Sequence, residues 1–190
     1  MVIKKVKTAV FISGTGSNFK NLIKFSKLKN SPIMIDLVIS NNPGAKGLHF
    51  AKKNRIKKKI FTFKNQKIDE KKILNYLKRG KMKLICLAGF MKILSKSFIQ
   101  QFKGKILNIH PSLLPKYKGL NTHIRAIRNK EEFSGCTVHF VSAKLDSGKI
   151  ILQKKVKIKK NESPNSLAKR VLKQEHILYP RAIKKLFSNP

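Results

Sequence analysis

The residues best suited to chemistry lie in one segment of the chain, ILNIHPSLLPKYKG (106–119). A short apolar run there ends in Asn108 and His110 and turns at Pro111 and Ser112, as a strand does where a loop begins. Side chains two positions apart on a strand share a face, so the amide and the imidazole are expected side by side. An amide donor beside an imidazole that gives or takes a proton suits acyl transfer. The alternative for an isolated N-x-H is a polar strand edge without chemistry.

A glycine-rich turn, ISGTGSNF (12–19), follows the first apolar run and precedes a helical pattern. Backbone N–H groups in such a turn can point at an anion, and the helix dipole adds to the attraction. Gly14 and Gly16 fit only part of a dinucleotide fingerprint, and the Lys of an ATP-binding loop is missing. The turn therefore favours a single phosphate. The alternative is a plain strand-to-helix connection capped by Ser17 or Asn18.

Asp146 is one of only eight acidic residues and precedes Gly148 between two strand-like runs, in KLDSGKIILQ (144–153). Taken alone, it is explained as the first residue of an Asx-turn. No metal is expected, because the five histidines and two cysteines show no ligand spacing such as C-x-x-C or H-x-x-x-H. Cys86 and Cys136 lie inside apolar runs, which predicts buried free thiols and a reducing cytoplasm.

The elements that must position these residues alternate between apolar, strand-like runs and helical patterns. This alternation predicts an α/β fold of three layers, with a mostly parallel twisted sheet and helices on both faces. The last helix is expected to start at Pro164 with Ser163 as its N-cap, and Pro180 is a candidate kink. Strands are predicted at 8–13, 34–40, 58–63, 83–90, 105–110, 136–142 and, near an edge, 149–158, with helices near 17–29, 44–54, 68–79, 121–130 and 163–187.

The length of 190 residues suits one domain over 1–190, with a full hydrophobic core. No apolar run reaches the roughly 18 residues that a transmembrane helix needs. The start, MVIKKVKTAVFIS, carries no cleavage-type site and is interpreted as a first strand and not as a signal peptide.

The net charge of +36 suggests nucleic acid as a partner, but its distribution argues against specific binding. Of the 44 basic residues, 38 are Lys and 6 are Arg, whereas base and phosphate recognition favours Arg. The Lys residues are spread over the whole chain. We interpret the charge as background that still attracts anionic ligands.

Six motifs along the chain resemble, in the same order, those of the folate-dependent formyltransferases: ISGTGSN, LAGFMKILS, NIHPSLLP, GCTVHFV, LDSG and QEHILYP. The resemblance covers nearly the whole chain and implies the Rossmann-like fold of that family. It is strongest to members that move a formyl group from 10-formyltetrahydrofolate to the amine of glycinamide ribonucleotide, small-molecule substrates that need no metal. A monomer or weak homodimer in the cytoplasm is expected.

The resemblance also assigns residues. Asn108, His110 and Asp146 correspond to the catalytic set, in which the carboxylate stabilises the protonated imidazole through an ordered water. The phosphate of the ribonucleotide is expected to bind at Gly16, Ser17 and Asn18. Glu175 is expected to contact the ribonucleotide as well. The pterin is expected to bind to one segment, through backbone groups and apolar side chains of Met91, Lys92, Ile93 and Leu94. Asn108 is expected to contact the folate as well.

Two positions depart from the family pattern. Leu172 stands where the family often has Gln, so Lys173 is a candidate substitute. Gln66 stands where a basic residue faces the folate, with Lys64 or Lys67 as substitutes.

Three other functions stay open at this point. A formyltransferase acting on methionyl-tRNA shares H-P-S-L-L-P and would use the positive charge, but it normally adds an RNA-binding domain and lacks the G-S-N turn. A formyltetrahydrofolate hydrolase usually adds an N-terminal domain. A basic nucleic-acid-binding module would not need the three catalytic side chains.

Overall fold

The computed structural model of the chain describes residues 5–187, which form one seven-stranded sheet in the order β3-β2-β1-β4-β5-β6-β7. β1 pairs in parallel with β2 and β4, and β2 pairs in parallel with β3. β6 and the edge strand β7 are antiparallel. The mostly parallel sheet is confirmed. The strands are β1 (Val6–Ile12), β2 (Ile33–Ser40), β3 (Lys57–Ile60), β4 (Leu84–Leu87), β5 (Lys105–His110), β6 (Phe133–Phe140) and β7 (Ile150–Lys157).

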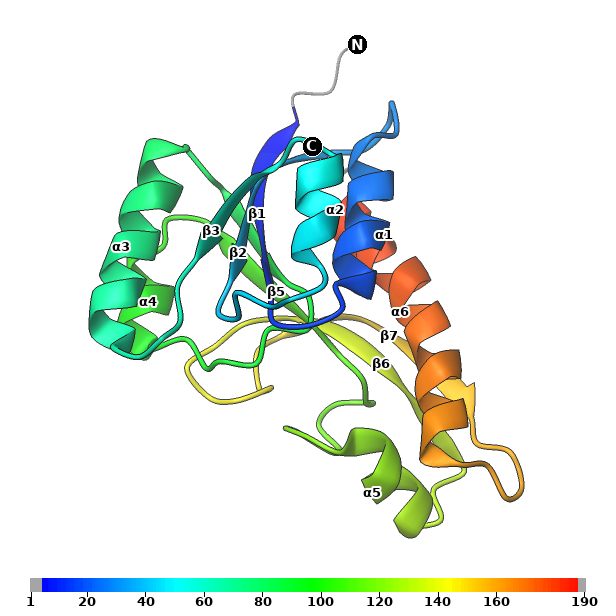
Figure 1. Cartoon of the computed structure of the whole chain (residues 1–190). Helices are drawn as coiled ribbons and strands as arrows, with labels where there is room; N and C mark the ends of the chain where they lie inside the picture. The colour runs from blue at the N-terminus through cyan, green and yellow to red at the C-terminus, as the bar shows by residue number, and fades with distance from the viewer. Residues whose placement is uncertain (1–4, 188–190) are drawn as a thin grey trace. The chain divides into compact units, whose positions relative to one another are not determined.

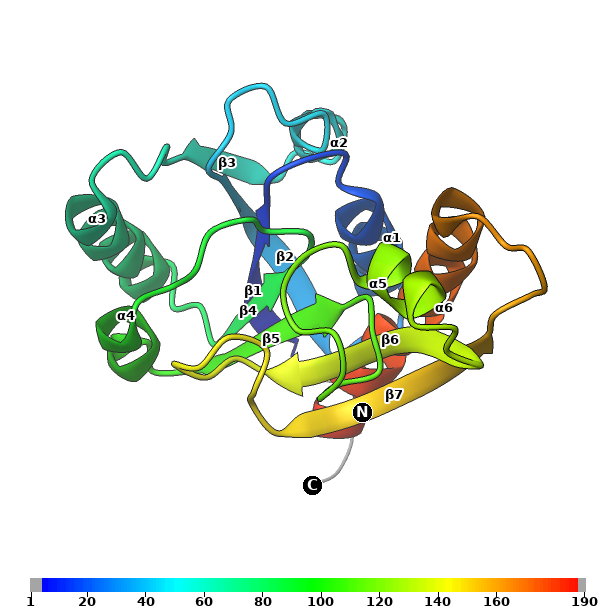
Figure 2. The ribbon, with the colours of Figure 1, turned by 90° about the horizontal axis from the view of Figure 1, so that it is seen from below.

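Helices alternate with the strands along the chain (Figure 1). In the part that precedes β5, α1 and α2 cover one face of the sheet, and α3 and α4 cover the other (Figure 2). This is the layered arrangement that parallel strands require, since both of their faces are apolar. The helices are α1 (Ser17–Ser26), α2 (Leu48–Lys53), α3 (Gln66–Arg79), α4 (Lys96–Gln101), α5 (Thr122–Arg128) and α6 (Pro164–Phe187).

The described chain divides into two compact units, one ending at Leu107 and the other running from Asn108 to Leu186. In the first unit, Phe11 of β1 makes edge-on ring contacts with Phe90 and with Phe98 of α4. In the second unit, α6 has a buried face that includes Tyr179, which is fully buried. The single domain expected over 1–190 stays a prediction.

Two predicted strands are shorter in the structure. The run 58–63 forms a strand only to Ile60, because Phe63 adopts a left-handed φ of 60°. Its backbone N–H donates to Asp69 Oδ2 at 2.8 Å, which ties the chain to the first turn of α3. The run 83–90 ends as β4 at Leu87, because Gly89 turns the chain with a φ of 72°. Both strands therefore stop where a loop must begin.

The last helix starts at Pro164, as predicted, and Ser163 Oγ accepts from Ser166 N at 3.2 Å. α6 runs on through Pro180 to Phe187. Between Lys5 and Phe187, no helix combines the length and the apolar character needed to span a bilayer.

Candidate active site

His110 ends β5 and is only 5% exposed. Its Nε2 lies 2.9 Å from the backbone oxygen of Tyr117, and its Nδ1 lies 3.3 Å from Oδ2 of Asp146. A carbonyl oxygen can only accept a hydrogen bond, so Nε2 carries a proton. Nδ1 is therefore the nitrogen that faces the carboxylate, and a proton that arrives at Nδ1 completes an ion pair.

Asp146 lies in the connection between β6 and β7, with a left-handed φ of 45°. Its side chain is 8% exposed, and Oδ2 also accepts from the backbone N–H of Gly119 at 2.9 Å. The family resemblance implied a water between this carboxylate and His110. That expectation is wrong for this structure, because 3.3 Å between Nδ1 and Oδ2 is a direct contact.

Asn108 completes the cluster, and it brings in a histidine that the sequence did not single out. Nδ2 of Asn108 lies 3.3 Å from Nε2 of His139 and 3.5 Å from Oδ1 of Asp146. His139 Nδ1 lies 2.8 Å from the carbonyl oxygen of Phe140, so Nδ1 is the donor and Nε2 accepts from the amide. Burial lowers the pKa of His139 and keeps it neutral. Its place in GCTVHFV was the only signal that could have identified it.

Hydrogen bonds from Thr137 of β6 and Gln153 of β7 hold the loop after β5. Thr137 Oγ1 donates to the Ser112 carbonyl at 2.6 Å and accepts from Leu114 N at 3.1 Å. Gln153 Nε2 donates to the same hydroxyl at 2.9 Å and to the Leu114 carbonyl at 2.8 Å. Ser112 Oγ in turn donates to the Lys116 carbonyl at 2.6 Å. The loop that carries Tyr117 is therefore held at several points.

The glycine-rich turn begins α1 without a side-chain cap. Gly16 is the N-cap, in a left-handed conformation with φ 73°, and neither Ser17 nor Asn18 caps the helix. The capping alternative is therefore wrong. A Cβ on Gly16 would lie 2.6 Å from Cα of Gly47, so only glycine fits the turn. The first turn of α1 also has no acidic side chain, which leaves the positive end of the helix dipole for an anion.

Ser13 connects the end of β1 to the loop after β4. Its hydroxyl accepts from Met91 N at 2.7 Å and donates to Oδ1 of Asn41, and its own N–H donates to the Gly89 carbonyl at 3.1 Å. Within the first unit, Ser13 therefore links the glycine-rich turn to the predicted pterin segment.

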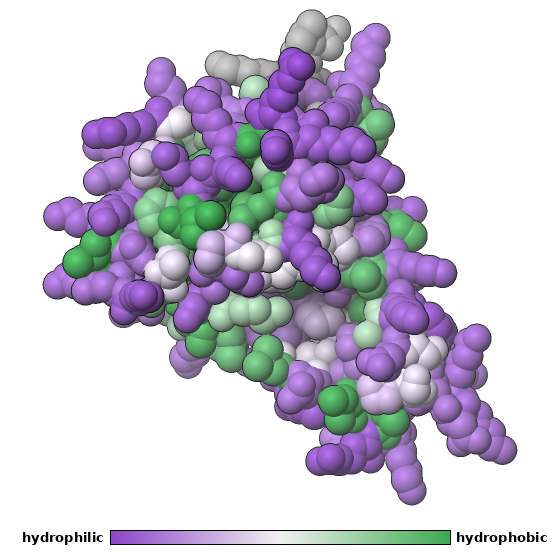
Figure 3. Space-filling view, in the orientation of Figure 1, coloured by the Kyte–Doolittle hydropathy of each residue, from purple (hydrophilic) through white to green (hydrophobic). Residues whose placement is uncertain are grey.

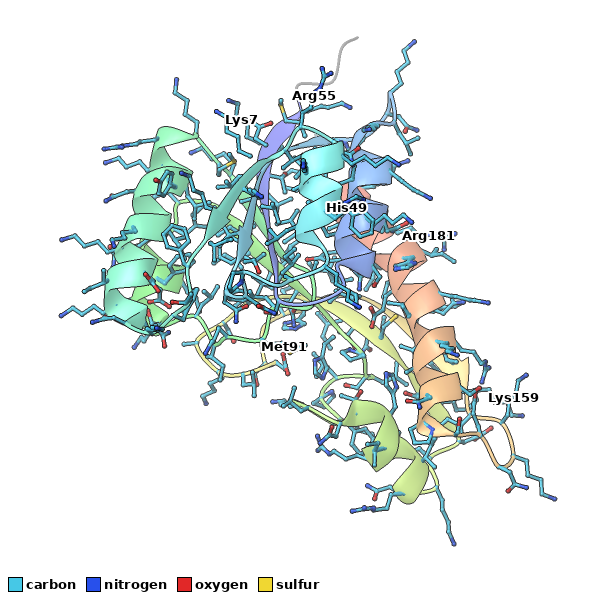
Figure 4. All side chains as sticks on the ribbon, in the orientation of Figure 1. Lys7, His49, Arg55, Met91, Lys159 and Arg181 are labelled. Carbon is cyan, nitrogen blue, oxygen red and sulfur yellow. The ribbon has the colours of Figure 1, made fainter. Side chains whose placement is uncertain are left out.

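The predicted pterin segment presents two of its apolar side chains to solvent. Met91, labelled in Figure 4, is 64% exposed and Ile93 is 63% exposed, whereas Leu94 is buried. Lys92 is exposed. The side chain of Leu94 therefore lies in the core, and only its backbone groups are left for contact with the pterin.

Gln66 has a structural task that the sequence did not reveal. Its Nε2 donates to the Ile93 carbonyl at 2.8 Å and to Glu70 Oε1 at 2.9 Å. Glu70 is 5% exposed and accepts from both Ser95 N at 2.8 Å and Ser95 Oγ at 2.5 Å. α3 thus fixes both the pterin segment and the start of α4. Lys64 and Lys67 stay exposed next to it.

Glu175 and the remaining candidates lie in the second unit. Glu175 is 6% exposed on α6, and its charge, after burial, helps to raise the pKa of Cys136 to about 12. Both Cys136 and Cys86 are buried free thiols, as predicted. Burial and then the charge of His110 lower the pKa of His123, which therefore lies near the cluster. Lys173 is exposed.

No cluster of three or more metal-type side chains is present in the 183 residues from Lys5 to Phe187. His110, His139 and Asp146 approach one another, but both nitrogens of His139 and Nε2 of His110 contact backbone or amide groups, and Nδ1 of His110 faces Asp146.

A substitution at Gly148 tests whether the cluster around His139 and Asp146 depends on the conformation of the loop between β6 and β7. A Cβ there would lie 1.7 Å from the carbonyl oxygen of Phe140, the acceptor for His139. Gly148→Ala is therefore expected to displace that carbonyl, lower the free energy of unfolding by about 1–3 kcal/mol and reduce catalysis. Urea unfolding and formyl-transfer rates measure both effects. Gly44→Ala, whose Cβ would meet nothing closer than 3.4 Å, is the control, and equal behaviour of the two variants would contradict this prediction.

The mostly parallel α/β fold and the cluster of Asn108, His110 and Asp146 suit a group-transfer enzyme, and the comparison with known families agrees. Residues 6–183 match the family described as formyl transferase, and the chain belongs to that family.

Of three relatives, two are named phosphoribosylglycinamide formyltransferase, and the third is named as a protein of purine biosynthesis. The chain is 45% identical over 181 residues to phosphoribosylglycinamide formyltransferase of Haemophilus influenzae, covering 94% of this chain and 85% of that protein. It is 43% identical over 183 residues to the human trifunctional purine biosynthetic protein adenosine-3, covering 95% of this chain but only 18% of that protein. The crystal structure of phosphoribosylglycinamide formyltransferase from Brucella melitensis superposes with a TM-score of 0.92 at 40% identity, covering 98% of each chain.

Proposed function

We propose that this chain transfers the formyl group of 10-formyltetrahydrofolate to the amine of 5-phosphoribosylglycinamide, a step of purine synthesis. The observation that carries the proposal is the cluster of Asn108, His110 and Asp146, in which two potential donors meet one buried carboxylate. The similarity to enzymes named phosphoribosylglycinamide formyltransferase supports the choice of substrate.

The reaction needs no covalent enzyme intermediate. The glycinamide nitrogen attacks the formyl carbon, a C–N bond forms, and the carbonyl oxygen becomes an oxyanion. When the tetrahedral intermediate collapses, the bond from the formyl carbon to the folate nitrogen breaks. The proton that the amine loses replaces the formyl group on that nitrogen, so the products are the N-formyl ribonucleotide and tetrahydrofolate.

Each residue of the cluster has a distinct role. Asn108 and the positive charge of protonated His110 stabilise the oxyanion, and a well-placed donor contributes roughly 2–4 kcal/mol. His110 also carries the proton toward the leaving nitrogen. Asp146, 3.3 Å from Nδ1, orients the ring and balances its positive charge. His139 holds the Asn108 amide from the other side.

Substrate binding is proposed for three other parts of the chain. The ribonucleotide phosphate is assigned to the turn of Gly16, Ser17 and Asn18, whose glycine-capped helix start favours an anion. Glu175 is assigned to the ribonucleotide. The pterin is assigned to one segment, with exposed apolar side chains at its first and third positions: Met91, Lys92, Ile93 and Leu94.

The setting we propose is the reducing cytoplasm, which suits the two buried free thiols. The partners are the two small substrates, and the chain acts as a monomer or weak homodimer.

One assay tests the proposal directly. The purified chain is given 10-formyltetrahydrofolate with either glycinamide ribonucleotide or methionyl-tRNA, and release of tetrahydrofolate is followed. Formylation of the ribonucleotide alone is expected, because the glycine-rich turn suits one phosphate. Preference for methionyl-tRNA would replace the proposal by the tRNA-directed alternative, and folate turnover without an acceptor would replace it by hydrolysis.

The basic surface gives the nucleic-acid alternative its only support. Hydrophilic side chains dominate the face seen in Figure 3, and Figure 4 shows long side chains extending from widely separated elements, with Lys7, Arg55, Lys159 and Arg181 labelled. No Lys or Arg between residues 5 and 187 is buried. Because the Lys residues are spread along the whole chain, the charge alone does not indicate a sequence-specific nucleic-acid site.

A salt titration on the same preparation separates the two functions. RNA binding is expected to be weak and lost by about 0.2 M salt, because it rests on counterion release alone. Formyl transfer should keep its kcat while KM for the anionic substrates rises moderately through lost steering. Tight RNA binding at high salt, or activation by RNA, would favour a working nucleic-acid surface.

A further inference from the structure

Tyr117 lies in the loop after β5 and connects the catalytic histidine to the far end of α5. We propose that Glu131 is a positioning residue, which fixes Tyr117 and thereby holds His110 in one tautomer. The proposal rests on the role of His110 in the proposed function. Glu131 itself contacts neither ring nitrogen of His110.

Among the described residues, the ring of His110 has two polar neighbours, the backbone carbonyl of Tyr117 and the carboxylate of Asp146. At 2.9 Å from Nε2, it places the proton of the neutral ring on that nitrogen and leaves Nδ1 for Asp146 and the reaction. If this carbonyl moved away, the preference for the Nε2–H tautomer would weaken. The carboxylate of Asp146, 3.3 Å from Nδ1, favours the other tautomer, in which Nδ1–H faces the carboxylate and Nδ1 can no longer accept a proton.

The backbone of Tyr117, which carries this carbonyl, has an unfavourable conformation that needs support from other contacts. Tyr117 has a φ of 56°, in the left-handed region that a bulky residue avoids because of steric strain. Such a residue stays in place only when its surroundings hold it. The side chain of Tyr117 supplies those contacts.

Glu131 is the centre of the contacts on the Tyr117 ring. Its Oε1 accepts from the Tyr117 hydroxyl at 2.8 Å, and Lys116 Nζ lies 2.8 Å and 2.9 Å from the two carboxylate oxygens. Asn129 Nδ2 also donates to the hydroxyl at 3.0 Å, and the Arg125 guanidinium lies 5.1 Å from the centre of the ring.

The residues around the Tyr117 ring are held by backbone contacts, and Glu131 supplies the negative charge among them. The backbone N–H of Glu131 donates to the Ala126 carbonyl at 3.1 Å, just past the end of α5, and Arg125 Nη1 donates to the Lys118 carbonyl at 2.7 Å. The hydrogen bonds from Lys116 and then Tyr117 lower the pKa of Glu131, so it is ionised at neutral pH. Without it, the cations of Lys116 and Arg125 remain beside the ring with no carboxylate between them.

Three variants and one control test the proposal. Glu131→Ala and Tyr117→Phe both remove the hydroxyl–carboxylate contact, while the Tyr117 carbonyl itself remains. Glu131→Gln keeps an acceptor for the hydroxyl and loses the charge. Glu132→Ala removes the neighbouring, exposed carboxylate and controls for the change in net charge.

We expect kcat to fall about tenfold in Glu131→Ala and Tyr117→Phe, with KM of both substrates within about twofold of the parent, because the reacting geometry and not binding is disturbed. Glu131→Gln should recover part of the loss, and Glu132→Ala should match the parent. A purely structural role would instead lower stability without this separation of kcat from KM.

The decisive readout is the ¹⁵N NMR signature of His110 in the substrate-free protein, which reports which nitrogen carries the proton. The parent should show the Nε2–H form, and Glu131→Ala and Tyr117→Phe a mixture of both tautomers. An unchanged tautomer in both folded variants overturns the proposal, whatever the rates. A changed tautomer in a protein that forms no formyl ribonucleotide would support positioning by Glu131 and reject the proposed function.

Discussion

His110→Ala is expected to leave a folded protein whose kcat is lower by roughly a hundredfold or more, since it removes both an oxyanion donor and the proton carrier. Asn108→Ala and Asp146→Ala should fall in the same range. Asn108 and His110 both approach Asp146, and all three side chains act on one transition state, so double variants should lose far less than the product of the single losses. Steady-state kinetics of formyl transfer, with circular dichroism as a check on folding, measures these effects.

His49→Ala is the matched control for these substitutions. His49 is an exposed histidine on α2, labelled in Figure 4, and has no part in the cluster. Its variant should keep the parent kcat. Near-parental turnover in His110→Ala would remove His110 from the mechanism and with it the role of Asp146.

The part of the site that lies on one strand could be predicted from the sequence. β5 runs over Lys105–His110 as expected, and its alternation puts Asn108 and His110 within reach of the same carboxylate. A period of two fixes this relation whatever the rest of the fold does. Asp146 was a candidate because a carboxylate in so basic a chain is rare.

The supporting residues could not be predicted, because their roles depend on contacts between distant segments. Gln66 reaches the carbonyl of Ile93, and Ser13 reaches Asn41 and Met91. Nothing local in the sequence marks either side chain as a hydrogen-bond partner. The shortening of β3 has a similar cause: Phe63 leaves the sheet because its N–H donates to Asp69.

The few carboxylates of this chain mark places where the fold requires an acceptor. Each of six has a named partner, and two of these, Glu70 in α3 and Asp146 between β6 and β7, accept from backbone N–H groups next to proposed site residues. A surface dominated by Lys tolerates substitution almost anywhere, whereas a carboxylate that accepts from backbone N–H groups does not. The six are Asp36, Asp69, Glu70, Glu131, Asp146 and Glu162.

Ser17→Asp should raise KM for the ribonucleotide by a hundredfold or more, while KM for the folate changes little. The new carboxylate would stand at the first residue of α1, where the proposed phosphate binds. Two like charges about 4 Å apart repel by about 4 kcal/mol at the effective dielectric constant of a protein surface. The substitution should not unfold the chain, because an acidic residue at a helix N-terminus is worth about 0.3–1 kcal/mol of stability.

The control for charge is Asn165→Asp, which adds the same carboxylate to the exposed first turn of α6 and should leave both KM values unchanged. Initial rates measured over a grid of both substrates give the two KM values separately, and thermal unfolding gives the stability. A rise confined to the ribonucleotide locates its phosphate on the turn, because only a bound anion distinguishes Ser17→Asp from its control. Equal losses for both substrates would mean that the turn is structural and that the phosphate binds elsewhere.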